Sequence, residues 1–191
     1  MEHARYEHLL IFGLIMVAVW FLVTYFLPRM LMYVFKRAIL VKGFGEGAIP
    51  INTLYTQPQT KFADPLHSSG SRLTITGVNR DTLITIGWLD LSKGPQILHV
   101  TDMAGRYYSM QLTDPSKNIA FAYVGKRTTG TGAGDYLICG PRWKGAVPQG
   151  VSQISSPNNS VLIIGRVLVG NDSDLPDAYR LSKQIQLSSL M

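Results

Sequence analysis

Residues 9–27 read LLIFGLIMVAVWFLVTYFL, a run of nineteen positions that contains no charged side chain. As a helix rising about 1.5 Å per residue, the run would be roughly 28 Å long, close to the hydrocarbon thickness of a bilayer. A helix also satisfies its own backbone amides, as a lipid environment requires. The run therefore predicts a single transmembrane helix, with residues 1–28 anchoring a more polar remainder.

A cleaved signal peptide is the alternative explanation of this run. Signal peptides combine a basic start with an apolar core of about 7–15 residues and a small-residue cleavage site. Here Glu2 and Glu7 accompany Arg5 at the start, the apolar run is longer, and no Ala-x-Ala-like site follows it. We therefore expect an anchor that is retained.

Pro28 follows the apolar run, and because proline lacks an N–H we expect it to kink or end the helix. Residues 29–42 are then predicted to form a basic amphipathic segment at the membrane interface. The side chains of Arg29, Lys36 and Arg37 would extend from it to lipid phosphates.

The basic residues that flank the apolar run are unevenly distributed. Arg5 precedes the run, whereas Arg29, Lys36, Arg37 and Lys42 follow it. Because Lys and Arg are enriched in cytoplasmic flanks, this count favours a cytoplasmic domain. A basic interfacial helix can also lie against anionic lipid on the outer side. The flanking charges alone therefore leave the orientation open.

The charge balance argues against nucleic-acid binding. The formal net charge is +6, but residues 43–191 carry only thirteen basic and ten acidic side chains. The densest basic group in the sequence, Lys126 and Arg127 with Arg142 and Lys144, is too sparse for a phosphate-backbone surface. Cys139 is the single cysteine, so no internal disulfide can form, and its apolar neighbours predict a buried thiol.

Short runs of β-branched and aromatic residues dominate the chain after residue 72. Residues 43–71 are rich in Gly, Pro, Ser and Thr and are predicted to be a linker leading into the domain. The runs that follow predict strands: 72–76, 82–91, 96–100, 107–112, 119–124, 135–140 and 160–169. Their spacing predicts a mainly β fold, a single β-sandwich or jelly-roll-like domain over 72–191.

One short helix is predicted at the C-terminal end of this domain. We expect Asp174 to cap it, with Pro176 and Asp177 in the first turn. Its apolar positions fall near helical spacing: Leu175, Ala178, Leu181 and Ile185.

A phosphate-binding loop needs a glycine five residues before its Gly-Lys pair and a Ser or Thr directly after the lysine. The glycine-rich stretch GKRTTGTGAGD (125–135) does not match, because Ala120 and Arg127 occupy these two positions. No strand–helix unit surrounds its glycines, which also argues against a dinucleotide site. We predict a long hairpin turn. The turn could still offer backbone amides with Lys126 and Arg127 to an anion.

His99 and Asp102 are the one close His–carboxylate pair of the domain. A general base needs an imidazole held by a carboxylate and aimed at a nucleophile. Strand alternation places His99 on the same side as Ile97, which favours a core or rim histidine with satisfied hydrogen bonds. We predict no catalytic residue from this pair.

Metal binding has little support in the sequence. The domain has too few His and Cys residues for zinc. The spacing of its aspartates does not require calcium, although carboxylates are suitable ligands: Asp81, Asp90, Asp102 and Asp114. We therefore predict no metal and no cofactor.

Polar side chains cluster before two of the predicted strands, in NRDT (79–82) and GRYYSMQLTDP (105–115). Asn, Asp and Arg in such places commonly build turns. The alternative is a ligand site near the strand ends, for which the candidate residues are Asn79, Asp81, Arg106, Tyr108, Arg127 and Thr128.

Four segments carry a resemblance to a known family: VNRDTLITIGWLDLSKGP, GRYYSMQLTDPSKN, GKRTTGTGAGDYLICGPRWKGAVP and GRVLVGNDSDLPDAYRLSKQIQLSSL. Over about residues 72–190 the chain resembles the bacterial domain-of-unknown-function family 1254. The resemblance implies a mostly β, secreted or membrane-tethered protein and transfers no catalytic residue. In many such proteins a second β-rich domain, family 1214, follows, near where Met191 stands here. A separate family 1214-like protein is therefore an expected partner.

The resemblance also bears on location, because similar proteins are typically exported. We expect a single-pass protein of the bacterial inner membrane with its domain in the periplasm, against the count of flanking charges. The expected role is a non-enzymatic binding or assembly module of the envelope. The alternative is a ligand-binding or enzymatic subunit with a polar Arg/Tyr/Asp pocket, so catalytic activity is left open.

Overall fold

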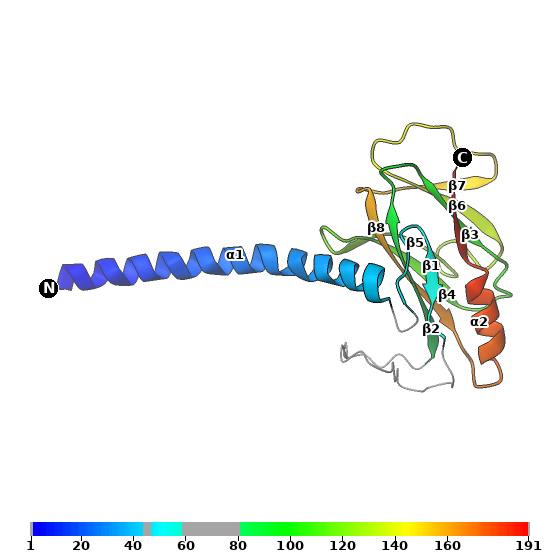
Figure 1. Ribbon diagram of the computed structural model, residues 1–191, viewed down its shortest axis with the longest axis horizontal. Coiled ribbons are helices and arrows are strands. Elements are labelled where there is room, and N and C mark those ends of the chain that lie inside the picture. Colours follow the sequence, from blue (N-terminus) through cyan, green and yellow to red (C-terminus); the bar gives the residue numbers. More distant parts are fainter. Residues whose placement is uncertain (1, 44–46, 59–80, 191) are drawn as a thin grey trace. The chain divides into compact units, whose positions relative to one another are not determined.

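The computed structural model describes residues 2–43, 47–58 and 81–190 (Figure 1). The chain divides into two compact units, Met1–Ala38 and Ile39–Met191. The predicted strand at 72–76, the last part of the predicted linker and the candidate residue Asn79 lie outside the described residues.

Helix α1 spans Glu2–Lys42. It makes up the first unit, and its last residues, from Ile39 to Lys42, are counted in the second. Pro28 lies inside this helix, so the helix does not end at the proline, and the predicted anchor and interfacial segment belong to one continuous element. The Arg29 guanidinium donates to the Tyr25 carbonyl at 2.6 Å and lies 3.7 Å from the centroid of the Tyr25 ring. This side chain therefore supplies a hydrogen bond close to the position where proline removes a backbone donor.

Helix α1 is apolar on all sides over most of its length. Leu14, Trp20 and Phe26 have exposed fractions of 70%, 61% and 58%. The most apolar 18-residue window of the segment His8–Lys42 has a mean hydropathy of 2.5. By length and composition, α1 is therefore able to cross a membrane.

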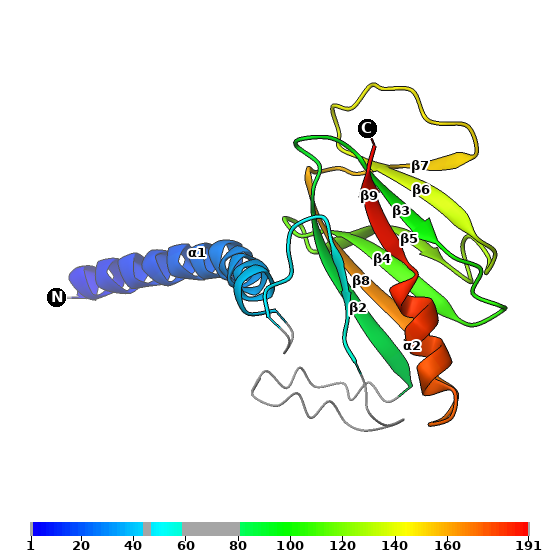
Figure 2. The same ribbon diagram turned by 45° about the vertical axis from the view of Figure 1, so that its right-hand side comes forward.

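The second unit is mainly β, with two sheets and a short helix (Figure 2). The first sheet has the strand order β1 (Leu54–Thr56), β2 (Thr82–Asp90), β8 (Ser160–Leu168), β4 (Tyr108–Asp114), β5 (Ile119–Gly125). The second has the order β7 (Val151–Ser155), β6 (Gly134–Cys139), β3 (Gln96–Val100), β9 (Gln186–Ser189). Neighbouring strands are antiparallel, except that β6 and β7 are parallel.

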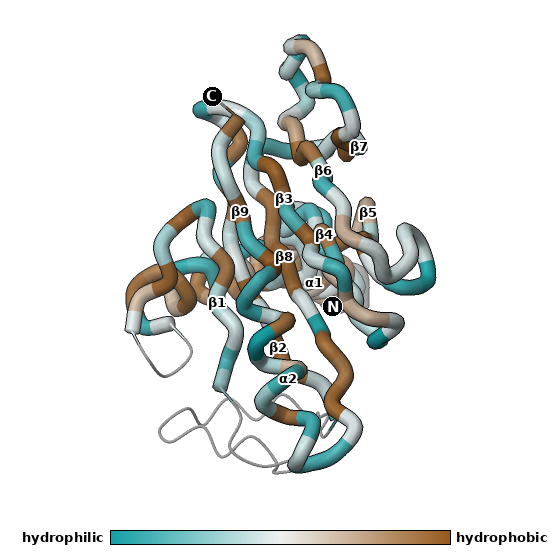
Figure 3. The backbone as a smooth tube through the Cα atoms, turned by 90° about the vertical axis from the view of Figure 1, so that its right-hand side faces the viewer, coloured by the Kyte–Doolittle hydropathy of each residue, from teal (hydrophilic) through white to brown (hydrophobic). Residues whose placement is uncertain are grey.

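The two sheets share one hydrophobic core. Strand β3 shows the alternation that produces it, because Leu98 and Val100 are buried in the core cluster while Ile97 and His99 are only half-buried. The same cluster contains Leu83 and Ile163 from the first sheet. In Figure 3 hydrophobic positions recur along β3 and β8. The mainly β prediction is confirmed, and six of the predicted runs form strands.

The C-terminal helix α2, Leu175–Lys183, is also confirmed. The four apolar positions expected on its inner side, Leu175, Ala178, Leu181 and Ile185, are buried, the last of them just beyond the helix. Asp174 stands at the N-cap position, but its side chain makes no capping hydrogen bond. The expectation that this side chain caps the helix is wrong, because it binds elsewhere.

The connection between β5 and β6 is not a hairpin, which corrects the expectation for 125–135. Strand β5 pairs with β4 in the first sheet, and β6 pairs with β3 and β7 in the second. The glycine-rich stretch therefore carries the chain from one sheet to the other. Gly130 has a φ of 84° there, a left-handed conformation that glycine adopts without strain.

Cys139 is a free cysteine and is buried, as its apolar neighbours predict. Its Sγ accepts a hydrogen bond from the Gln153 side chain at 3.2 Å. The thiol is therefore part of the contact between the parallel strands β6 and β7.

Candidate functional site

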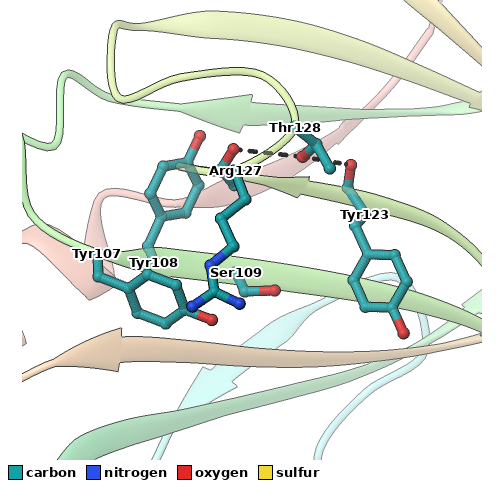
Figure 4. A pocket seen from close by; sticks show the side chains of 7 residues that line it. Tyr107, Tyr108, Ser109, Tyr123, Arg127 and Thr128 are labelled. Atoms are coloured by element: carbon teal, nitrogen blue, oxygen red, sulfur yellow. Dashed lines mark hydrogen bonds between the residues drawn. The ribbon is translucent and has the colours of Figure 1, made fainter.

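A pocket of about 160 Å³ lies where β4 begins and β5 ends (Figure 4). Three groups of residues line it: the start of β4 and the residue before it, the second half of β5, and the turn that follows. The lining residues are Tyr107, Tyr108, Ser109, Tyr123, Gly125, Arg127 and Thr128.

The close approach of β4 and β5 makes this pocket possible. Ser109 is the register partner of Gly125. A Cβ atom added at Gly125 would lie 2.5 Å from the Tyr108 carbonyl oxygen and 2.9 Å from the Ser109 Cα. Both are backbone atoms that cannot move without disturbing the strand. Gly125 therefore permits the two strands to meet at the base of the pocket.

The turn after β5 is closed by short hydrogen bonds. The Gly125 carbonyl accepts from the backbone N–H groups of Thr128 and Thr129, each at 2.9 Å. The Thr128 hydroxyl donates to the Tyr123 carbonyl at 2.9 Å. These bonds fix the backbone on both sides of Arg127 and so define where its side chain leaves the turn.

The pocket combines aromatic rings with one positive charge. The Arg127 guanidinium carbon lies 5.6 Å from the centroid of the Tyr107 ring. In Figure 4 the Arg127 side chain extends between Tyr107 and Tyr123. Tyr123 is 46% exposed, whereas Tyr108 is fully buried and its burial raises the pKa of its hydroxyl. The seven lining residues include three tyrosine hydroxyls, two hydroxyls from Ser109 and Thr128, and one guanidinium, all of which can form hydrogen bonds with a ligand.

Arg106 lies outside the pocket and is held by Asp174. Its Nη1 donates to Asp174 Oδ2 at 2.6 Å and to the Leu168 carbonyl at 2.7 Å, and its Nη2 donates to Asp174 Oδ1 at 2.5 Å. The Gly170 N–H also donates to Asp174, at 2.7 Å. The hydrogen bond from Arg106, followed by that from Gly170, lowers the pKa of Asp174 to about 2. Arg106 therefore ties the start of α2 to the end of β8.

The structure brings together three of the six candidate residues: Tyr108, Arg127 and Thr128. Asp81 is exposed and does not line the pocket, although its backbone carbonyl accepts from the Val169 N–H at 2.7 Å. The sequence reasoning did not identify Tyr107, Ser109 and Tyr123. Their proximity depends on the register of β4 against β5, although the neighbouring tyrosines at 107 and 108 were a usable signal.

His99 is paired differently from the sequence hypothesis. Its Nδ1 lies 2.8 Å from Asp135 Oδ1 and its Nε2 lies 2.6 Å from Ser188 Oγ. Asp102 instead accepts from the Ala104 backbone N–H at 2.8 Å. His99 and Asp102 therefore do not form the pair that a general base would need, and the favoured expectation of a histidine with satisfied hydrogen bonds is confirmed.

Metal coordination would need several acidic, histidine or cysteine side chains close together. Within residues 2–43, 47–58 and 81–190, no three of them gather in an arrangement that could hold a metal ion.

Comparisons with known proteins extend the description of this domain. The model of the family described as "Protein of unknown function (DUF1254)" matches residues 58–189. The crystal structure of the VPA0106 protein from Vibrio parahaemolyticus is similar, with a TM-score of 0.55 and 32% sequence identity. The match covers 59% of this chain and 28% of that chain, so the chain spans less than a third of the Vibrio protein. None of the curated proteins matches.

Proposed function

Since the chain belongs to the DUF1254 family, which is described only as of unknown function, we propose a role from its own geometry: a membrane-anchored module that binds another protein. Helix α1 serves as the single-pass anchor. The two sheets of the second unit form a β-sandwich that presents the binding surface. The observation that carries the proposal is the edge strand β5, whose exposed Tyr123 lines the same pocket as Arg127.

The proposed binding surface, called the β5 surface, consists of Tyr107, Tyr123 and Arg127. Among the described strands, β5 pairs only with β4, so one side of its backbone faces away from the sheet. Tyr123 of this strand is 46% exposed. An apolar edge strand is a template for pairing with another chain, and soluble domains normally protect such edges.

The chemistry of the β5 surface fits a protein partner. Tyr and Arg are enriched among the residues that contribute most to protein–protein binding energy. Tyr107 and Tyr123 offer flat aromatic contacts, and Arg127 adds a charged group next to Tyr107. We infer that the partner contributes an extended segment or strand with an acidic side chain to meet Arg127.

A folded β-rich domain is the proposed source of that segment. The family 1214-like domain named by the sequence resemblance is the natural candidate. In the Vibrio protein the matched part is 28% of the chain, so there the similar domain is accompanied by much additional polypeptide. This supports a partner that is itself a folded domain.

Site-specific photocrosslinking in the native membrane tests this proposal. A benzophenone amino acid would replace Tyr123, and, as a matched control, Tyr179 of α2, which is half-buried against the core. The proposal requires a crosslink to one β-rich protein from position 123 and none from position 179. Equal products from both positions, or none from position 123, would contradict it.

A small anionic ligand is the second candidate, favoured by the pocket that Arg127 shares with three tyrosines. Titration with inorganic phosphate or acetate, followed by NMR of the arginine side chains, would distinguish anion binding from the protein-binding role. Saturable shifts confined to Arg127 would support the ligand role, and unchanged spectra would exclude it for these anions.

The anchor is proposed to place the β-sandwich in the periplasm of a bacterium, with the N-terminus in the cytoplasm. The family resemblance supports this orientation, whereas the basic residues that follow the apolar run oppose it. The apolar character of α1 over His8–Lys42 supports the membrane crossing itself.

A further inference from the structure

Three polar side chains of the second sheet form a continuous hydrogen-bonded chain, at a site separate from the β5 surface. Asp135 of β6 contacts His99 of β3, at 2.8 Å between Oδ1 and Nδ1. His99 contacts Ser188 of β9, at 2.6 Å between Nε2 and Oγ. Figure 2 shows that the three strands are neighbours in the sheet.

The strand register explains why these residues meet. His99 is the direct partner of Asp135 on β6, and Ile97 is the direct partner of Ser188 on β9. Since residues two apart in a strand point to the same side, His99 and Ser188 are diagonal neighbours on one face. The adjacent residue Leu98 enters the core cluster, so this face is the outer one. The His99 and Asp135 side chains are 40% and 47% exposed, which leaves them accessible.

The direction of each hydrogen bond follows from elementary chemistry. An ionised carboxylate has no proton to donate, so His99 Nδ1 carries the hydrogen and donates it to Asp135. In a neutral imidazole the other nitrogen then has a free lone pair. His99 Nε2 therefore accepts from the Ser188 hydroxyl. A serine hydroxyl is bound to an imidazole base, and a carboxylate holds that imidazole in the required tautomer.

The edge position of β9 leaves one backbone donor close to Ser188. The Leu190 N–H donates to the Pro95 carbonyl at 3.3 Å, so residues 188 and 190 turn their N–H groups toward β3. By the alternation of an antiparallel ladder, Ser189 turns its N–H away from β3. This N–H belongs to the residue directly after Ser188 and is aimed at the open edge, where negative charge on a reacting oxygen could be stabilised.

We propose that Ser188 is a nucleophile for acyl transfer, with His99 as its general base and Asp135 as the positioning residue for His99. The substrate class is an accessible ester. Ser188 Oγ attacks the carbonyl carbon while its proton passes to His99 Nε2. The bond from that carbon to the leaving oxygen breaks, and the alcohol departs with the proton from Nε2. Water then attacks the carbonyl carbon of the acyl-serine while His99 Nε2 takes its proton. The bond to Ser188 Oγ breaks, the acid is released, and the serine regains its proton from Nε2.

A covalent probe tests the reactivity of this serine in the full chain, purified in mild detergent. A fluorophosphonate reacts with an activated serine by losing fluoride, and mass spectrometry of the peptides locates the label. The label is expected on Ser188. Ser152→Ala provides a matched control in the same sheet, because Ser152 is an exposed serine of β7 outside this hydrogen-bonded chain. It should label like the unmodified protein, whereas Ser188→Ala should not label.

The contribution of the other two residues is measured from the labelling rate. His99→Gln is expected to slow labelling roughly 100-fold, the lower end of general-base contributions, because the site is exposed. Asp135→Asn should also slow it, and Asp135→Glu should restore part of the rate, a rescue that a merely structural role would not give. Thermal unfolding of each variant shows whether it is folded.

Two results would overturn the proposal. One is the absence of label on Ser188 in the folded, unmodified protein. The other is labelling of Ser188 at an unchanged rate in folded His99→Gln. In either case the three residues would only connect strands β6, β3 and β9. Hydrolysis of p-nitrophenyl acetate that disappears in Ser188→Ala and persists in Ser152→Ala would establish turnover.

Discussion

Arg106 and Asp174, separated by 68 residues, form a two-point ion pair in which each of two guanidinium nitrogens donates to a different carboxylate oxygen. The exposed fractions of the two side chains are 17% and 26%. Because the guanidinium also reaches the Leu168 carbonyl, one side chain joins the loop before β4, the end of β8 and the start of α2. The pair holds together three segments that are distant in sequence.

Removing one member of this pair should destabilise the second unit. Asp174→Asn leaves the partly buried guanidinium without its charged partner, and we expect a loss of roughly 1.5–3 kcal/mol in the free energy of unfolding. Urea unfolding of the full chain in detergent, followed by tryptophan fluorescence, measures it. Asp177→Asn is the control, since Asp177 is 69% exposed and pairs with Arg180 at 3.3 Å. Equal losses in the two variants would contradict this role.

The same pair predicts a dependence of stability on pH. The folded-state pKa of Asp174 lies at about 2, below its ordinary value of 3.8. Its contribution is therefore complete above the ordinary value and is lost as the pH falls from there toward about 2. Burial tends to raise the pKa of Asp114, but hydrogen bonds from Ser116 and Asn158 outweigh it and lower that pKa. Protonation of Asp114 therefore also reduces the free energy of unfolding as the pH falls. The free energy of unfolding, measured between pH 5 and pH 2, should decline less steeply with falling pH in Asp174→Asn. An unchanged decline would refute the contribution of Asp174 to this pH dependence.

Gly125 should tolerate no side chain. In Gly125→Ala the new Cβ would meet the Tyr108 carbonyl oxygen at 2.5 Å, so the strands must separate, at an expected cost of roughly 1–3 kcal/mol. Gly132→Ala in the same connection is the control, because a Cβ there has nothing within 4 Å. Thermal unfolding compares the two. Similar unfolding temperatures would mean that β4 and β5 do not need this close approach.

The membrane orientation can be measured with a new surface cysteine. Cys139 is 1% exposed and is a poor target, whereas Lys144 is exposed. In Cys139→Ala, Lys144→Cys, a membrane-impermeant maleimide should label intact spheroplasts if the second unit is periplasmic. Labelling that occurs only after lysis would place it in the cytoplasm, as the flanking charges suggest. The Cys139→Ala protein alone gives the background.

The strands that could be predicted from the sequence differ physically from those that could not. Strands β2 and β8 have neighbours on both sides and bury most of their residues, so their apolar runs are long. The unpredicted strands β1, β7 and β9 all lie at the edges of their sheets. They are short and partly exposed, and β7 and β9 are rich in Ser and Gln, so no strong pattern marks them.

The candidate sites show a similar limit. Arg127 and Thr128 could be predicted to lie together from the sequence, because both belong to one turn. The contacts of His99 join residues 36 and 89 positions away, and they depend on which strands are neighbours and in which register. Asp174 was expected to cap a helix because nothing near it in the sequence reveals Arg106.

The central position of β8 has implications for how the chain acquires its structure during synthesis. Both β2 and β4 pair with β8, and Thr82 has its partner in Leu168. Neither strand can gain its full set of neighbours until residue 168 is available, so one edge of each of these apolar strands stays unpaired until then. Such long-range pairing makes folding slow, because distant segments must be brought together first. A nascent chain with these properties would depend on holding chaperones until β8 arrives.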